Sequence, residues 1–311
     1  MDSKSITITN GGDHMSTSCF HQVYSRKCFD GYQQVFKHFS KELNCDMNFS
    51  IYIPPIALES QKVPVIYFLS GFATTEEDIV TRTGFQRYAS ELGVCIVGPD
   101  TAPRNVTIDY PEFEKHLIAN FYVDVHKGPW SEHLKMYSYL RNEFIPSIEN
   151  HFSFIEKDNR SIMGYSMGGH GAIMLSVKNP GMFRSCSALA PPYGIMKVKL
   201  GNKAYRAFFG DDDEEIKKWE LDDLIMAYKG PDLHLRVDQG AGDKFIKNGD
   251  FKPYVLIDSC IKANFSIQFN LQEGYGHGWY FVSSFVGSHF RHHMQFLKKN
   301  LENKKQCQHH L

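Results

Sequence analysis

The chain has 311 residues, of which 42% are apolar and 14% aromatic, and its 34 basic and 35 acidic side chains nearly cancel. This length suits one large α/β domain, and the balanced charge argues against the basic face of a nucleic-acid-binding protein. The apolar runs, such as residues 63–69, are far shorter than the roughly 18 residues of a membrane span. The polar N-terminal segment lacks the apolar centre of a secretory signal, so we expect a cytoplasmic protein that binds neither nucleic acid nor membrane.

Three segments follow from the distribution of polar residues. Residues 1–20 are polar and lack periodicity, so we expect a disordered N-terminal extension. Residues 21–300 form one predicted domain, and residues 301–311 form a polar C-terminal tail. The seven cysteines are scattered without a C-x-x-C pair, which is typical of reduced thiols.

Strand and helix patterns alternate along the predicted domain. Residues 23–54 favour hairpin strands, since residues 48–53 alternate polar and apolar side chains before Pro54 and Pro55. Further strands are predicted at 65–69, 94–99, 160–164, 186–190, 233–237 and 265–271. Helices are predicted at 85–92, 136–152, 168–178, 254–263 and 281–297, and residues 200–230 are mostly helical. This order predicts an α/β fold, with a mostly parallel central sheet covered by helices on both faces.

Residues 164–168 read Gly-Tyr-Ser-Met-Gly and match G-x-S-x-G. A strand precedes the motif and a helix follows it, as in the sharp turn that presents a nucleophilic serine. Side chains on both sides of such a turn would clash, which explains the glycines. Ser166 is therefore the candidate nucleophile, and the alternative is a serine that only caps the helix.

A serine nucleophile needs a histidine base and a carboxylate that orients it. In an α/β-hydrolase, the fold of which this serine turn is typical, both follow the serine, on loops after later strands. His277 stands between glycines after the last predicted strand and is the candidate base. Asp238 and Asp243 both follow the strand at 233–237, and spacing favours Asp243 without excluding Asp238.

The oxyanion hole should use the backbone N–H of Met167, which follows the nucleophile. The second donor should come from the loop after strand 65–69, and Phe72 N–H is our choice there. His170 is interpreted as support for the pocket. His289, His292 and His293 have zinc-like helical spacing, but a solvated or packed helix face is the favoured interpretation. No phosphate-binding or dinucleotide motif is present, and we expect no metal.

These residues together resemble the S-formylglutathione hydrolase (esterase D) family. The resemblance runs from about Lys27 to His293, and its motifs are residues 42–45, 67–71, 99–101, 121–124, 136–139, 166–172, 179–181, 237–240 and 271–275. It implies that the triad is Ser166, Asp243 and His277, which selects Asp243, and that Phe72 and Met167 supply the oxyanion donors. The chain departs from the family pattern at Thr74, at Leu117–Asn120 and at Gly276.

The resemblance implies hydrolysis of S-formylglutathione to glutathione and formate, the second half of glutathione-dependent formaldehyde detoxification. It also implies activity on small esters, no cofactor, a cytosolic location and a homodimer. Two alternatives stay open from the sequence. One is a carboxylesterase of the same fold with broader specificity, and the other is a non-catalytic binding protein on this fold.

Overall fold

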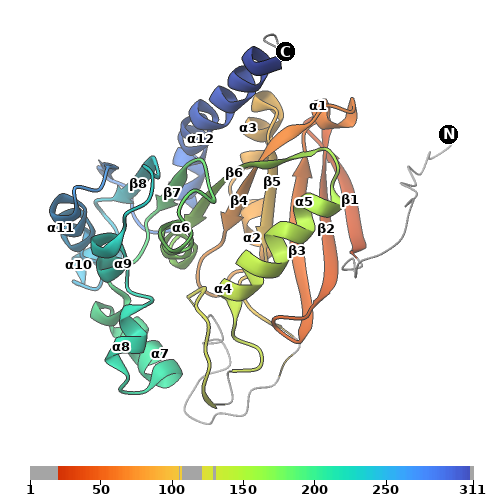
Figure 1. Cartoon of the computed structure of the whole chain (residues 1–311). Helices are drawn as coiled ribbons and strands as arrows, with labels where there is room; N and C mark the ends of the chain where they lie inside the picture. The colour runs from red at the N-terminus through yellow and green to blue at the C-terminus, as the bar shows by residue number, and fades with distance from the viewer. Residues whose placement is uncertain (1–19, 105, 107–120, 129–130, 309–311) are drawn as a thin grey trace.

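The computed structural model describes residues 20–104, 106, 121–128 and 131–308. Nine strands form one sheet in the order β1-β2-β3-β5-β4-β6-β7-β8-β9 (Figure 1). The first three strands and the β3–β5 pair are antiparallel, while the pairs from β5 through β9 are parallel. The sheet is therefore mostly parallel with an antiparallel N-terminal edge, and the predicted fold class is confirmed.

The strands are β1 (His21–Cys28), β2 (Gly31–Ser40), β3 (Cys45–Ile53), β4 (Val63–Leu69), β5 (Cys95–Pro99), β6 (Ile155–Tyr165), β7 (Cys186–Leu189), β8 (Leu235–Gly240) and β9 (Ile267–Gln272). The helices of the first half are α1 (Pro55–Leu58), α2 (Glu76–Arg82), α3 (Phe85–Leu92), α4 (Met136–Ser138), the π-helical turn η3 (Tyr139–Phe144) and α5 (Ile145–His151). Those of the second half are α6 (Met167–Lys178), the 3₁₀ turn η4 (Ile195–Lys197), α7 (Lys199–Phe209), α8 (Asp213–Lys217), α9 (Leu221–Ala227), α10 (Lys244–Lys247), α11 (Pro253–Ala263) and α12 (Trp279–Gln308).

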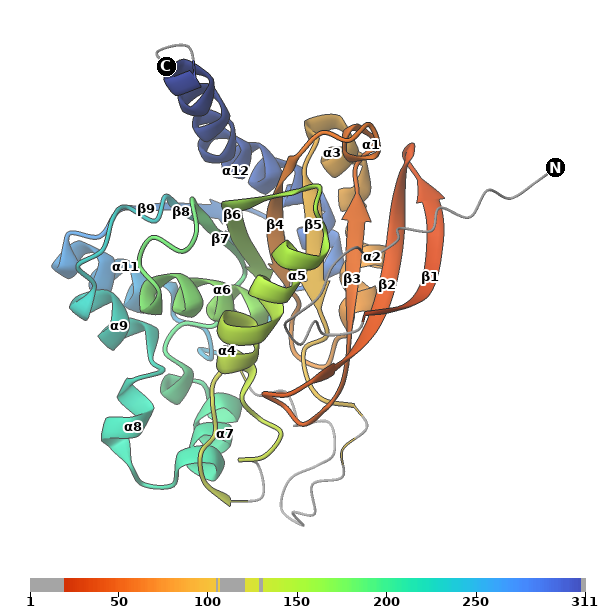
Figure 2. The ribbon, with the colours of Figure 1, turned by 45° about the vertical axis from the view of Figure 1, so that its right-hand side comes forward.

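Strand β4 shows why the central strands read as continuous apolar runs. All its residues are buried, because helices cover both faces of the sheet. Val65, Tyr67 and Leu69 face a core that includes α5 and α6, whereas Ile66 and Phe68 face a second core with α3 and α12. Figure 2 shows α5 and α6 on one side of the sheet and α12 leaning across the other.

The structure shifts the bounds of several predicted elements. The strand expected at 233–237 begins at Leu235 and continues to Gly240, because His234 has a positive φ of 47° that breaks the extended backbone. Helix α2 was not predicted, although Thr75 begins it with a capping box that Asp78 completes.

The structure adds detail at both ends of the predicted domain. Helix α12 extends to Gln308, so most of the expected polar tail is helical. Residues 301–308 contain Lys, Glu, Gln and Leu, which favour helix, and no Gly or Pro interrupts this segment. Residues 1–19 lie outside the described part, but Phe20, which we assigned to the extension, packs on Phe49 with ring centroids 4.9 Å apart.

Candidate active site

The candidate nucleophile lies in the sharp turn between β6 and α6. Ser166 has φ 53° and ψ −123°, a strained backbone conformation for a residue with a side chain. A Cβ on Gly164 would lie 2.0 Å from the carbonyl oxygen of Gly168, and one on Gly168 would lie 2.1 Å from that of Leu69. The two glycines are thus required by close backbone contacts. The Ser166 side chain does not cap α6, which leaves its hydroxyl free to interact elsewhere.

The structure brings Ser166, His277 and Asp243 together although they are far apart in sequence. Ser166 Oγ lies 3.0 Å from His277 Nε2, and His277 Nδ1 lies 2.7 Å from Asp243 Oδ2. Asp243 is fully buried, while the His277 side chain keeps 10% of its surface exposed. This is the geometry in which a carboxylate orients an imidazole and the imidazole takes a proton from a serine.

Asp243 is the N-cap residue of α10, at the end of the short turn that leaves β8. Its Oδ1 accepts from the N–H of Phe245, and its Oδ2 accepts from His277 and from Nε2 of Gln239 at 2.9 Å. Burial alone would raise the pKa of Asp243, but these hydrogen bonds together lower it below the ordinary value. The carboxylate is therefore ionised when it faces the imidazole.

Asp238, the other candidate acid, lies within β8 and points to the opposite face of the sheet. It is fully buried and accepts from Arg236, Asn270 and Gln272, with the Arg236 Nε at 2.7 Å. Successive side chains of a strand alternate between faces, so Asp238 points to the α12 side, away from His277. It therefore makes a structural ion pair.

Three aromatic rings enclose the imidazole of His277. The centroids of Phe245, Tyr165 and Phe251 lie 4.8, 5.3 and 5.7 Å from its own. Tyr165 precedes the serine, and Phe245 also donates its backbone N–H to Asp243. The rings limit rotation of the imidazole and exclude water from one side of it. No local sequence pattern predicts this enclosure.

The loop between β4 and α2 lies directly beside the serine. A Cβ on Gly71 would be 3.3 Å from the Ser166 Cβ, which places the next residue, Phe72, at the edge of the site. Thr74 closes the loop, because its hydroxyl donates to the Gly71 carbonyl at 2.6 Å. Its own carbonyl accepts from Arg104 at 2.6 Å. Met167 is the first residue of α6, so its N–H has no intrahelical acceptor.

A second group of serines and histidines lies behind β7, under α12. Ser187 Oγ lies 2.8 Å from both His289 Nδ1 and His293 Nε2. The other nitrogen of His289, Nε2, lies 3.0 Å from Asp238 Oδ2, but the two atoms are poorly aligned for a hydrogen bond. Ser187, His289 and His293 are fully buried, so no substrate can reach them. Of the two predicted alternatives, a solvated or a packed helix face, the structure shows the packed one. Within the described residues, no cluster of three or more potential ligands could hold a metal ion.

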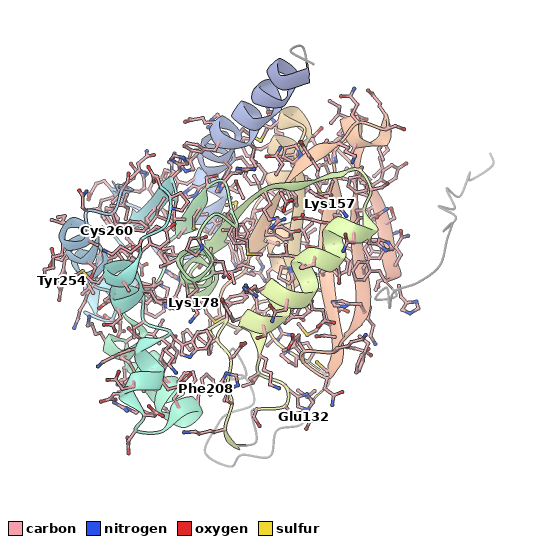
Figure 3. The ribbon with its side chains drawn as sticks, viewed as in Figure 1. Glu132, Lys157, Lys178, Phe208, Tyr254 and Cys260 are labelled. Atoms are coloured by element: carbon pink, nitrogen blue, oxygen red, sulfur yellow. The ribbon has the colours of Figure 1, made fainter. Side chains whose placement is uncertain are left out.

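An open groove of about 730 Å³ lies elsewhere, between the end of α6 and α5. Figure 3 labels Lys178 and Lys157 at its two sides. Arg160 in this groove already pairs with Glu149 at 2.6 Å, and none of the lining residues comes from the loops that carry Ser166, Asp243 and His277. The groove is therefore separate from the candidate active site. Across the described residues, no helix is long and apolar enough to cross a membrane.

Comparison with known proteins agrees with this arrangement. A family model described as "Putative esterase" matches residues 40–295. The chain is 39% identical to the S-formylglutathione hydrolase of Mus musculus and 40% identical to that of Rattus norvegicus, in each case over 89% of this chain and 98% of the relative. The structure of an S-formylglutathione hydrolase from Agrobacterium tumefaciens superposes with a TM-score of 0.82 at 33% identity, covering 89% of this chain and 99% of that one. The chain therefore belongs to the S-formylglutathione hydrolase family of esterases, within the α/β-hydrolase fold.

Proposed function

We propose that this protein is a serine thioesterase that hydrolyses S-formylglutathione to glutathione and formate. The observation that carries the proposal is the hydrogen-bonded series Ser166–His277–Asp243 at the turn after β6. Family membership supplies the substrate class, since the relatives bear the name of this activity.

In the first half of the proposed reaction, His277 Nε2 removes the proton of the Ser166 hydroxyl as Oγ attacks the formyl carbon. Asp243 holds the imidazole in the tautomer that has Nδ1–H and stabilises the imidazolium that forms. The N–H groups of Phe72 and Met167 are proposed to bind the oxyanion. When the tetrahedral intermediate collapses, the C–S bond breaks and the imidazolium protonates the sulfur, so glutathione leaves as its thiol.

In the second half, water replaces the thiol beside His277. The imidazole removes a proton from the water as its oxygen attacks the formyl ester of Ser166. Collapse breaks the bond to Oγ, returns the proton to Ser166 and releases formic acid, which ionises to formate. No cofactor takes part in this scheme.

Steady-state hydrolysis of S-formylglutathione beside a p-nitrophenyl ester tests the proposal. We expect a clear preference for the thioester, and Ser166→Ala should lower kcat/KM by several orders of magnitude on both substrates. A fluorophosphonate probe should label the native protein and leave Ser166→Ala unlabelled. Near-normal turnover by Ser166→Ala would contradict the proposed nucleophile.

The same assay decides between the two enzyme functions. A preference for the aryl ester would favour a carboxylesterase of broader specificity, which the family departures at Leu117–Asn120, outside the described residues, make an alternative. The family departure at Thr74 also concerns the site, because the Thr74 hydroxyl donates to the Gly71 carbonyl in the loop that carries Phe72. A different side chain at this position would change how that loop is held beside the bound acyl group. Absence of any labelling in folded protein would instead indicate a binding protein.

A cytoplasmic location and a homodimer complete the proposal. Cys28, Cys45, Cys95, Cys186 and Cys260 are free thiols, which supports a reducing compartment. The dimer follows from the family resemblance alone, and sedimentation equilibrium at assay concentration should give twice the chain mass of 35.7 kDa. A monomeric mass would reject it.

A further inference from the structure

We propose that Gln239, held by Tyr193, is a positioning residue that fixes the Asp243 carboxylate for catalysis. This inference rests on the proposed function and deepens it, because it assigns a role in the same site to two residues that do not touch the reacting atoms. It starts from Oδ2 of Asp243, which faces His277 and also accepts from Nε2 of Gln239.

The direction of these hydrogen bonds follows from what each group can do. An ionised carboxylate only accepts, so the amide nitrogen of Gln239 must face Asp243 and the amide oxygen must face the other way. That oxygen, Oε1, lies 2.9 Å from the hydroxyl of Tyr193, which must therefore donate. The result is a one-way series from Tyr193 O–H to Gln239 and from Gln239 N–H to Asp243.

Burial makes the series rigid. Gln239 and Asp243 are fully buried and Tyr193 is 1% exposed, so water does not compete for these donors and acceptors. Gln239 lies in β8 opposite Leu271 of β9, and Tyr193 lies in the segment after β7 with its ring against Phe251. The series thus connects the segments after β7 and β8 with the loop that carries His277.

The chemistry gives Gln239 an effect on the proton affinity of the Asp243–His277 pair. Its N–H stabilises the carboxylate most when His277 is neutral, because the negative charge on Oδ2 is then uncompensated. Loss of the N–H should therefore make the pair accept a proton more readily. It should also leave the carboxylate free to turn away from Nδ1, which would slow the chemical step.

The other ionisable groups near the pair are two tyrosines, a carboxylate that is already paired with an arginine, and a lysine. Burial raises the pKa of Tyr165 and of Tyr193, with the charge of Asp243 as a further cause. Asp238 is bonded to Arg236 on the opposite face of β8. Lys244 is the nearest cation along the chain, with Nζ 5.0 Å from the Phe245 centroid.

The experiment compares Gln239→Leu and Tyr193→Phe with a matched control, Gln33→Leu. Gln33 is also a buried amide, and it donates to the Ile51 carbonyl in the antiparallel part of the sheet. For Gln239→Leu we expect kcat to fall roughly 10- to 100-fold, the worth of a hydrogen bond to a charged group. The acidic limb of the kcat/KM profile should move to higher pH, and Tyr193→Phe should show a smaller change in the same direction. Gln33→Leu should keep both kcat and the pH profile.

Ser166→Ala, measured in parallel, separates this inference from the proposed function. If Ser166→Ala is inactive while folded Gln239→Leu keeps the wild-type kcat and acidic limb, the triad stands and the positioning role is wrong. A lower kcat with an unmoved acidic limb would also reject it, because general destabilisation lowers activity without changing the proton affinity. If Gln239→Leu does not fold, Tyr193→Phe decides: a shifted limb supports the role and an unchanged profile overturns it.

Discussion

Individual side chains in this protein take their roles from the side of the sheet that they face. Asp238 and Gln239 are neighbours in β8, yet one pairs with Arg236 near α12 and the other bonds to Asp243 near the candidate site. The period of two along a strand produces this separation. Asp238 and Asp243, the two candidate acids, thus have unrelated surroundings.

Substituting each carboxylate by its amide should separate their roles. Asp243→Asn should lower kcat roughly 10⁴-fold, because an amide N–H facing Nδ1 forces the imidazole into the tautomer that cannot accept the Ser166 proton. Asp238→Asn should leave the kcat of folded protein within a few-fold. It should cost about 3 kcal/mol of unfolding free energy, since Arg236 loses its buried partner. Urea unfolding and steady-state kinetics check both, and the reverse pattern would assign the catalytic carboxylate to Asp238.

At the scale of elements, the turn from β6 to α6 determines where the serine lies. The backbone of α6 begins in contact with the carbonyls at the end of β4, which leaves no space for a side chain on Gly168. The adjacent Gly169 is less crowded, because a Cβ there would lie 3.2 Å from its nearest atoms, the Ala188 Cβ, the Gly164 carbonyl oxygen and the Pro191 Cβ. A contact at 3.2 Å requires its neighbours to move only slightly, whereas a Cβ on Gly168 would overlap a rigid backbone carbonyl.

Gly168→Ala should therefore be much more harmful than Gly169→Ala. We expect a loss of about 3 kcal/mol or more of unfolding free energy for Gly168→Ala, at the upper end of overpacking costs. For Gly169→Ala, the gain in helix propensity of about 1 kcal/mol should offset much of the strain. Thermal unfolding and fluorophosphonate labelling measure both effects, and equal behaviour of the two variants would contradict the assigned backbone contact.

Across the whole molecule, buried histidines make folding sensitive to acid. Burial lowers the pKa of His170 to about 3 and that of His292 to about 4. It also lowers the pKa of His289 and brings that of His293 well below the ordinary value. Neither ring nitrogen of His170 has a hydrogen-bond partner within the part of the chain that the structure describes. These rings fold in the neutral form.

Stability should therefore fall as the pH drops below about 6.5, where unfolded histidine takes up a proton and the folded rings do not. Each ring contributes a slope of about 1.4 kcal/mol per pH unit until its folded pKa is reached. Glu76 and Glu220 have the opposite effect on stability, because burial raises the pKa of each to about 7. Between pH 7 and 4.5 the folded protein binds protons at these carboxyl groups and the unfolded chain does not, so they stabilise the fold as the pH falls. The four histidines outnumber them, so urea unfolding should give a lower free energy at pH 5 than at pH 7. The variant His170→Leu should reduce the slope, and an unchanged slope would contradict the assignment to His170.

The sequence by itself determined the alternation of strands and helices, the mostly parallel sheet and the position of the G-x-S-x-G turn. Hydrophobic runs, glycines and turn residues act locally, so their pattern can be read along the chain. It also indicated His277, because the order of strands assigns a loop to the base. The extension of α12 to Gln308 could also have been predicted from the sequence, since residues 301–308 favour helix without any tertiary contact.

Only the tertiary structure decided which polar groups meet. Residues alone left Asp238 and Asp243 open, because the choice depends on which face of β8 and which loop approaches His277. Gln239, Tyr193 and the three rings around the imidazole come from different segments, and no local pattern brings them together. Hydrogen bonds between distant segments are fixed by how strands pair and helices pack, and the chain sequence encodes these contacts only through the complete fold.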